Sequence, residues 1–287
     1  MYNFLEKLFF SIISLFKVLF FSKYKSDVLR LKTENKKCYI LGNGPSLNKD
    51  LLNNRDNLEQ SELIVVNFFA QSELFTQLKP KYNVLADPIF FDDDPDENIR
   101  DKVVGFFNYL RGNVSWDFFL FIPYEGYNYL KSHLQSNSNI HIIRYNRVSS
   151  RKSFLWLDRI IHNNQLAIFS GMNVVNVATY LAIMIGFKEI NLIGVDHSWF
   201  KNYNIGNDNS IYINDRHFYE NTKENIIPVV AVNLKTKQVY KLHELLMCES
   251  LALETYHMIE KYAQYKKTKI YNRCSFSHID AFERKNN

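Results

Sequence analysis

The sequence predicts an α/β fold: a single Rossmann-like domain with a mostly parallel sheet. Two observations lead to this prediction. From Lys37 onward, short apolar runs alternate with amphipathic stretches, as strands and helices do around a parallel sheet. The first apolar run ends at Gly42-Asn43-Gly44, and Pro45-Ser46 then opens a predicted helix. This strand, turn and helix order is typical of the binding edge of such a sheet.

The composition of the 287 residues fits a globular protein. With 9 Gly and 6 Pro, long disordered linkers are not expected. The three cysteines are scattered and show no zinc-binding spacing, which indicates a reducing compartment without a disulfide framework. The net charge of +5 is modest, and no basic stripe accompanies the aromatic residues. Nucleic-acid binding is therefore not expected.

Residues 1–36 form a separate segment, an apolar helix followed by basic residues. The run Leu8–Phe21 contains Lys17 and is shorter than the roughly 20 residues that span a bilayer. On a helix the polar residues gather within an arc of roughly 140°; they are Asn3, Glu6, Lys7, Ser11, Ser14 and Lys17. We predict an amphipathic helix in the plane of a membrane. The alternative is a helix packed on the protein's own core or on a partner chain.

Residues 37–287 are predicted to form one domain. Strands are expected at Cys38–Leu41, Leu63–Val66, Tyr82–Ala86, Phe118–Ile122, Ile140–Ile143, Glu189–Ile193 and Lys269–Tyr271. Helices are expected at Leu47–Arg55, Gln71–Leu78, Ile99–Leu110, Tyr127–Ser136, Arg151–His162, Met172–Ile185 and His243–Tyr265.

The stretch from His197 to Leu242 interrupts this alternation. It is polar, contains turns rich in asparagine and shows no clear period. An irregular insert of this length in a compact domain usually covers a binding site, so we predict a lid over residues 197–242.

The Gly42–Gly44 turn is predicted to bind a phosphate. Glycines let the backbone approach a ligand, and a helix N-terminus offers free N–H groups with partial positive charge. The spacing is neither the Rossmann G-x-G-x-x-G nor a Walker A loop, which ends in Gly-Lys-Ser/Thr. Ordinary dinucleotide and NTPase sites are therefore not favoured.

A second turn, Ser170-Gly171, precedes the predicted helix Met172–Ile185. Ser170 is expected to cap this helix, and Gly186 is expected to end it before the next strand. Asn173 and Asn176 either face a ligand or are ordinary first-turn residues.

The two turns resemble blocks of the bacterial lipooligosaccharide sialyltransferases of glycosyltransferase family 42. They also resemble the related 6-hydroxymethylpterin diphosphokinase (MptE)-like family. The first block is Gly42–Leu47, and the second runs from Ser170-Gly171 through the helix to Gly186–Asp196. The segments Asp196–Trp199 and Arg216–Tyr219 look more like the MptE-like branch found among surface-polysaccharide proteins. The resemblance implies a GT-A-like variant with a lid, a CMP-sugar donor and no metal or other cofactor.

Carried onto this sequence, the resemblance also implies roles for single residues. The nucleotide-binding residues are Gly42, Asn43, Gly44, Ser46, Asn67, Asp87, Ser170 and Gly171. The leaving-group or lid residues are Asp196, His197, Ser198, Tyr203 and Tyr219. His243, just after the lid, would be the general base, with His217 as second candidate. The unperturbed histidine pKa of about 6.5 suits that role.

Three features depart from the sialyltransferase pattern. Asp87 stands where that family has Asn before Pro, and Ala167 takes the place of an arginine. The paired tyrosines are not both matched, since Ser198 holds one place and Tyr203 lies only near the other. The identity of the donor sugar therefore stays open.

The expected function is that of a cytoplasmic glycosyltransferase, peripherally bound to the inner face of the cytoplasmic membrane. It would move a sialic-acid-like nonulosonate from CMP to a glycan or glycolipid acceptor of lipooligosaccharide or capsule, and a homo-oligomer is allowed. One alternative is a Mg²⁺-dependent diphosphokinase-like enzyme that uses Asp87 and the acidic run Asp92–Asp94, a run that is otherwise a solvated turn. Another is a non-catalytic scaffold of polysaccharide assembly.

Overall fold

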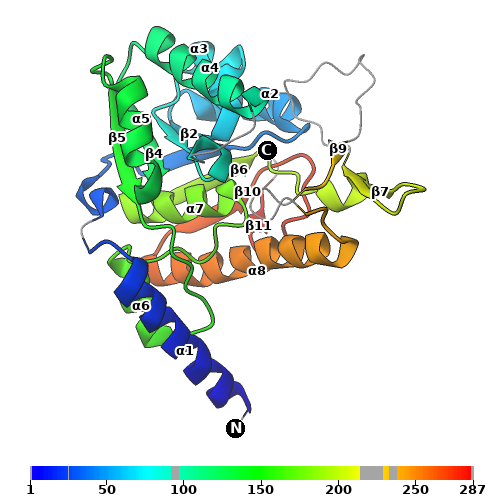
Figure 1. Cartoon of the computed structure of the whole chain (residues 1–287). Helices are drawn as coiled ribbons and strands as arrows, with labels where there is room; N and C mark the ends of the chain where they lie inside the picture. Colours follow the sequence, from blue (N-terminus) through cyan, green and yellow to red (C-terminus); the bar gives the residue numbers. More distant parts are fainter. Residues whose placement is uncertain (1, 25, 92–96, 214–228, 233–237, 286–287) are drawn as a thin grey trace.

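The computed structural model describes residues 2–24, 26–91, 97–213, 229–232 and 238–285. Its centre is an eight-stranded parallel sheet with the order β11-β10-β6-β1-β2-β3-β4-β5 (Figure 1). The strands are β1 (Lys37–Leu41), β2 (Glu62–Val66), β3 (Tyr82–Val84), β4 (Phe118–Pro123), β5 (Ile140–Tyr145), β6 (Glu189–Ile193), β10 (Lys269–Asn272) and β11 (Glu283–Arg284). The predicted α/β class with a mostly parallel sheet is confirmed.

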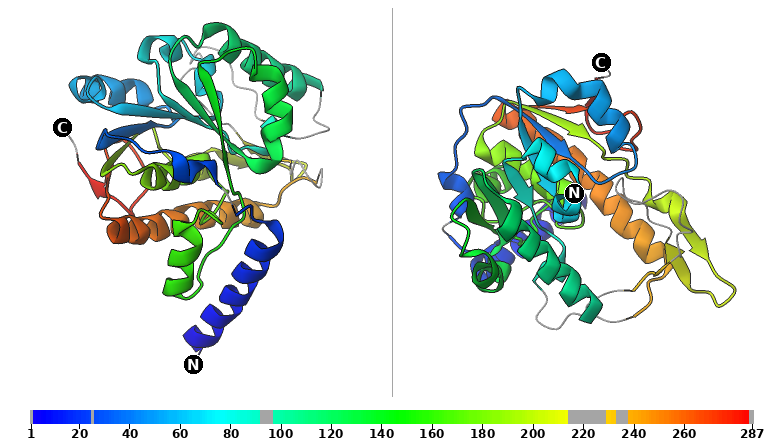
Figure 2. Two further views of the ribbon diagram at one scale, coloured as in Figure 1. Left: turned by 90° about the vertical axis from the view of Figure 1, so that its left-hand side faces the viewer. Right: turned by 90° about the horizontal axis from the view of Figure 1, so that it is seen from above.

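Helices cover both faces of the sheet, and so the strands are apolar on both sides (Figure 2). In β1, Cys38 and Ile40 belong to one core while Tyr39 and Leu41 belong to the other. One core is completed by α7 (Val174–Ile185) and α8 (Leu242–Lys266). The other is completed by α2 (Leu47–Leu58), α3 (Leu74–Leu78), α4 (Glu97–Asn113) and α5 (Tyr127–Leu134).

The strand order changes direction at β1. From β1 the chain builds β2 to β5 on one side, and β6, β10 and β11 lie on the other. The turns after β1 and β6 therefore diverge at one switch point, where open parallel sheets bind their ligands.

The ends of several elements differ from the predicted ones. A 3-10 helix, Asn67–Gln71, precedes α3, which begins at Leu74 and not at Gln71. Other 3-10 helices lie at Asp27–Arg30, Pro88–Phe90, Tyr124–Gly126 and Trp199–Asn202. The N-cap of α7 is Asn173, whose side chain accepts the Val175 N–H (2.7 Å), and not Ser170. Gly186 ends α7 in the left-handed conformation, as predicted.

The stretch after β6 is not uniformly irregular, contrary to the prediction. It holds a small antiparallel sheet of β7 (Tyr203–Ile205), β8 (Ile211–Ile213) and β9 (Val229–Val230). The β7–β8 hairpin turns at Gly206–Ser210, where the Gly206 N–H donates to the Ser210 carbonyl (2.9 Å). Ile211 packs with Ala231 and with Leu245 of α8, which ties this sheet to the domain.

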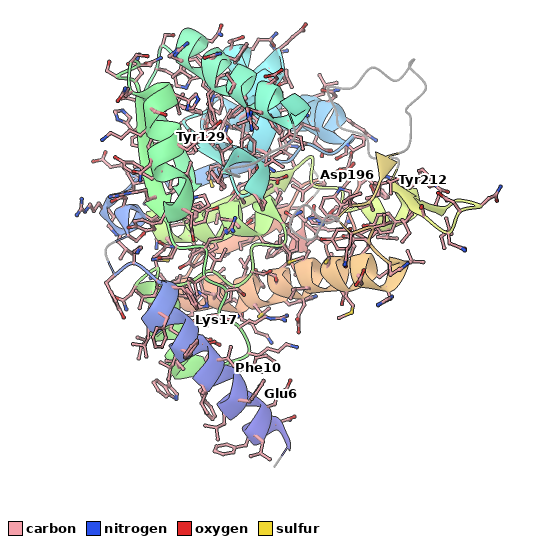
Figure 3. The ribbon with its side chains drawn as sticks, in the orientation of Figure 1. Glu6, Phe10, Lys17, Tyr129, Asp196 and Tyr212 are labelled. Atoms are coloured by element: carbon pink, nitrogen blue, oxygen red, sulfur yellow. The ribbon has the colours of Figure 1, made fainter. Side chains whose placement is uncertain are left out.

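Two helices, α1 (Tyr2–Phe21) and α6 (Leu155–Asn163), lie side by side outside the layered domain (Figures 1 and 2). The polar side of α1 faces the protein. Ser14 accepts a hydrogen bond from the Ser153 hydroxyl (3.0 Å), and Ser11 accepts one from the Phe154 N–H (3.0 Å). Glu6, Phe10 and Lys17 follow one side of the helix and are half-buried (Figure 3).

The apolar side of α1 faces outward. Its exposed large side chains are Phe4, Leu5, Leu8, Phe9, Ile12, Leu15, Phe16, Leu19, Phe20 and Phe21. This is the reverse of a helix that packs its apolar side on the protein's own core, one of the two predicted alternatives; the other, packing on a partner chain, stays a prediction. Within the described residues, none of the helices has both the length and the apolar character needed to cross a bilayer.

Candidate functional site

A cavity of about 630 Å³ opens at the carboxyl ends of β1, β2, β3 and β6. The turn after β1 and the turn before α7 both line it, so these two turns converge in space. The predicted residues in the lining are Gly42, Asn43, Gly44, Asn67, Asp87, Gly171, Asp196, His197 and Ser198. The site therefore lies at the switch point of the sheet, where the strand order predicts it.

The glycines of the first turn are needed because two loops touch, and not only because a ligand approaches. The Gly42 N–H donates to the Ile193 carbonyl (2.9 Å), and the Gly44 N–H donates to the Gly194 carbonyl (2.8 Å). A β-carbon at position 42 would overlap the Gly194 oxygen, and one at position 44 would lie 2.7 Å from it. The turns after β1 and β6 are thus clamped together.

Asp196 occupies the N-terminus of α2, which the sequence predicted to be free for a phosphate. Its carboxylate accepts the Ser46 N–H (3.0 Å) and the Ser46 hydroxyl. Burial raises the pKa of Asp196, and the two Ser46 hydrogen bonds oppose that rise. Asp196 lies near the middle of the molecule (Figure 3). Ser46 is therefore a partner of Asp196 and does not line the cavity.

Two asparagines hold the neighbouring turns. The Asn43 amide donates to the Val66 carbonyl (3.4 Å), while its Oδ1 is buried and has no partner among the described residues. Asn67 has a left-handed backbone (φ 45°), and its Oδ1 accepts the Ala86 N–H (3.3 Å). These bonds fix the ends of β1, β2 and β3 relative to one another.

The cavity wall beyond β3 carries charge of both signs. Asp87 accepts the Ile89 N–H (3.2 Å), and burial raises the pKa of its carboxyl while Lys102 and Arg147 oppose the rise. The Lys102 ammonium lies 4.5 Å from the ring centroid of Phe68. Lys102 is thus a cation in the lining that could meet a phosphate.

The opposite wall comes from α8. Cys248, Glu249 and Ala252 line the cavity, and the Tyr203 hydroxyl donates to the Glu249 carboxylate. Tyr203 itself is not in the lining. Glu249 is thus positioned by a residue of the small antiparallel sheet.

Comparison with known families decides the relationship. The profile of the family described as 6-hydroxymethylpterin diphosphokinase MptE-like matches residues 11–202, more than half of the chain. The chain belongs to this family. The predicted resemblance to the MptE-like family is confirmed.

Two other comparisons give less information about this MptE-like chain. One similar solved structure is the MAf glycosyltransferase from Magnetospirillum magneticum AMB-1, with a TM-score of 0.49 and 14% identity. The match covers 92% of this chain and 35% of that one, so this chain spans about a third of its length. Among curated proteins, no sequence matches the chain.

Some predicted residues of the MptE-like chain lie elsewhere. His243 is exposed in the first turn of α8, outside the lining, and is six residues before Glu249. Ser170 is buried and accepts the Met172 N–H (3.2 Å). His217 and Tyr219, like the acidic run Asp92–Asp94, lie outside the described residues. In the described part of the chain, no three His, Cys, Asp or Glu side chains are grouped to hold a metal.

The sequence prediction missed several lining residues, among them the polar ones Lys102, Asn202, Cys248 and Glu249. Lys102 and Glu249 lie on amphipathic helices full of charged residues, where periodicity alone does not distinguish a cavity-facing charge from a solvated one. The one usable sequence signal for Glu249 is its position one helical turn before the small apolar residue Ala252.

Two buried histidines should make the MptE-like chain less stable in acid. Burial lowers the pKa of His162 to about 4 and that of His197 to about 3. His197 Nε2 shares a hydrogen bond with the Tyr256 hydroxyl (2.7 Å). Both pKa values in the folded protein lie below the unfolded value of about 6.5. As the pH falls below this value, the histidines take up protons in the unfolded state before they do in the folded state, and the stability present at higher pH is lost.

We expect the free energy of unfolding to fall by about 2 kcal/mol per histidine between pH 7 and pH 5. Denaturant titrations at the two pH values measure this change. Asp158, whose pKa burial raises to about 6, acts in the opposite direction and offsets part of it. Asparagine tolerates the left-handed backbone at position 197 (φ 50°), so the His197→Asn variant is a suitable test. In this variant the fall in the free energy of unfolding that the histidines cause should be about half as large as in the wild type. Equal pH dependence of variant and wild type would contradict a buried neutral His197.

Proposed function

We propose that this MptE-like chain is a glycosyltransferase that moves a sialic-acid-like nonulosonate from a CMP donor to a surface-glycan acceptor. The observation that carries the proposal is the convergence of the two turns on one cavity at the switch point. The donor phosphate would lie against Lys102. Asp87, Asn43 and Glu249 are suited to accept hydrogen bonds from ribose or sugar hydroxyls.

The reaction also needs a group that removes a proton from the acceptor hydroxyl. We propose Glu249 for this role because the residue lines the cavity and its carboxylate is oriented by Tyr203. His243 remains the second candidate. Six residues along a helix correspond to a rise of about 9 Å and a rotation of about 240°, so His243 lies on another side of α8 than Glu249. Loss of turnover in Glu249→Gln with full turnover in His243→Ala would support the first assignment, and the reverse would overturn it.

The outward apolar side of α1 supports a peripheral membrane location. Leucine, isoleucine and phenylalanine side chains on one helix face partition into the headgroup and acyl boundary of a bilayer. A membrane-bound enzyme would have direct access to a lipid-linked acceptor.

A diphosphokinase-like reaction is the second candidate. It is favoured by the family description and by Asp87, the carboxyl group that the sequence assigned to this reaction, which lines the cavity. Such groups are the oxygen ligands that Mg²⁺ takes beside a diphosphate. In this alternative the ligand would be ATP with Mg²⁺.

Thermal stabilisation by nucleotides distinguishes the two candidates. A ligand at 100 times its dissociation constant should add about 2.7 kcal/mol to the free energy of unfolding. We expect CMP to stabilise the protein without added metal, and UDP, GDP and ATP to do so less. Stabilisation by ATP with Mg²⁺ alone would favour the diphosphokinase, and no response to any nucleotide would contradict both.

The Lys102→Gln variant should bind CMP at least roughly tenfold more weakly, because a charge-assisted hydrogen bond to phosphate contributes about 1.5–3 kcal/mol. Arg111→Gln, which removes an exposed charge from the same helix α4, is the matched control. Calorimetric titration with CMP gives both affinities. Equal affinities would remove Lys102 from the phosphate site.

A further inference from the structure

A second cavity, of about 300 Å³, lies between α6 and α8. Aromatic and basic side chains share its lining, among them Phe169, Tyr262, Tyr265, Lys152, Arg159 and Lys261. The transferase reaction proposed above uses none of them. A mixed lining of this kind suits a ligand with an anionic head and an apolar body.

Two of the basic groups are available to an anion. The Glu254 carboxylate forms ion pairs with Lys152 (2.9 Å) and Arg151 (3.4 Å). The Arg159 guanidinium lies 4.3 Å from the ring centroid of Tyr265, and Lys261 is exposed. No carboxylate of the described residues forms an ion pair with Arg159 or Lys261. The lining holds three basic side chains, Lys152, Arg159 and Lys261, against the two carboxyl groups of Asp158 and Glu254, so it keeps an excess of positive charge.

Two polar atoms at this cavity are buried without partners among the described residues, Nε of Arg159 and Oδ1 of Asp158. One needs an acceptor and the other a donor. A buried polar atom left unpaired costs about 1–3 kcal/mol, so such atoms usually meet a ligand or water. Both atoms have almost no accessible surface, so a phosphate oxygen and a hydroxyl group would satisfy them once the two side chains turn toward the cavity.

The cavity is next to the apolar surface at one end of the molecule. In α6, Leu155 lines the cavity, and Trp156 and Ile160 are exposed by 61% and 51%. α6 packs beside α1, with the rings of Phe4 and Phe154 5.6 Å apart (Figures 1 and 2). Tryptophan at such a position is typical of the membrane–water interface.

We propose that this cavity binds the headgroup of an anionic membrane phospholipid that carries hydroxyl groups. Arg159 and Lys261 would contact the phosphate, and Asp158 would accept a headgroup hydroxyl. The lipid chains would continue toward the exposed side chains of α6 and α1. The proposal concerns membrane binding and does not depend on which nucleotide the first cavity takes.

Vesicle flotation of the full chain tests this proposal. The probes are vesicles of phosphatidylcholine alone and of phosphatidylcholine mixed with phosphatidylglycerol, whose headgroup has a phosphate and free hydroxyls. The variant Arg159→Gln/Lys261→Gln is compared with Lys188→Gln/Lys269→Gln, which removes the same charge from exposed positions at the start of β6 and β10. Nucleotide stabilisation of each variant shows separately that the first cavity is intact.

We expect wild type and control to prefer the phosphatidylglycerol vesicles, and the cavity variant to lose roughly tenfold or more of that affinity, since a basic residue near an anionic surface contributes about a factor of five. Equal losses in both variants would overturn the proposal, because they would indicate general charge attraction. Displacement from the vesicles by inorganic phosphate at equal phosphate concentration would also overturn it, because the site would then take free phosphate. If the Asp158→Ala variant kept the full preference for phosphatidylglycerol vesicles, the proposed contact between Asp158 and a headgroup hydroxyl would be overturned.

Discussion

Replacing Phe9, Phe16 and Phe20 by serine is expected to release the protein from neutral vesicles by more than a hundredfold. The three side chains are exposed by 60%, 55% and 69%, so they contribute little to the folded core. Transfer of a phenylalanine from water to an apolar phase is worth about 1.5–3 kcal/mol when complete. Partial insertion of all three then gives about 3 kcal/mol or more, which is the hundredfold change.

The matched control replaces by serine three apolar side chains of similar or greater exposure that lie far from α1 in the sequence. Leu52, Ile205 and Met247 are exposed by 76%, 61% and 68%. Flotation at high salt isolates the hydrophobic contribution, because salt screens the attraction between basic residues and lipid headgroups. Thermal unfolding of both triple variants should match the wild type. Equal vesicle binding by the two triple variants would contradict a membrane role for α1.

The orientation of α1 shows what periodicity can and cannot predict. Helical spacing of serines and apolar residues predicted the helix and its two sides. It did not indicate which side faces the protein. That is decided by Ser11 and Ser14, which hydrogen bond to the segment before α6, and by Val18, which packs with Leu157. These contacts join positions more than a hundred residues apart.

The sheet could be predicted because its strands are buried on both faces. Seven apolar runs, from Cys38–Leu41 to Lys269–Tyr271, predicted strands, and each agrees with a strand of the structure to within two residues at either end. The strand β11 has two exposed residues, Glu283 and Arg284, and carries no apolar signal. The strands β7 and β8 are only three residues long and mostly not buried, so their stretch read as irregular.

The location of the site could be predicted from the sequence, but the chemistry of its residues could be predicted only in part. The Gly-Asn-Gly turn located the cavity because the end of a first parallel strand is a binding edge. The assumption that the α2 N-terminus stays free was wrong, since Asp196 fills it from the turn after β6, 150 residues after Ser46. A carboxylate there competes with a phosphate for the same N–H groups. No residue near Ser46 in the sequence indicates that Asp196 is its partner.

The clamp between the turns after β1 and β6 leads to the second large effect, on stability. Gly42→Ala should lower the free energy of unfolding by about 3 kcal/mol or more. The added β-carbon would overlap the Gly194 oxygen and lie 2.9 Å from Cγ2 of Val195. The oxygen belongs to backbone that β1 and β6 hold in register, from Lys37 paired with Glu189 to Leu41 paired with Ile193. It therefore has little freedom to move away.

Gly105→Ala is the control for this change. Gly105 lies inside α4, and a β-carbon there meets nothing within 4 Å. Alanine should stabilise this helix by about 0.5–1 kcal/mol, so the two identical substitutions are expected to act in opposite directions. Denaturant unfolding measures both, and CMP titration of Gly42→Ala should show weaker binding because the turn that lines the cavity must shift. If Gly42→Ala were as stable as the wild type, the two turns would not be clamped, and the shape of the cavity would have to be maintained by other contacts.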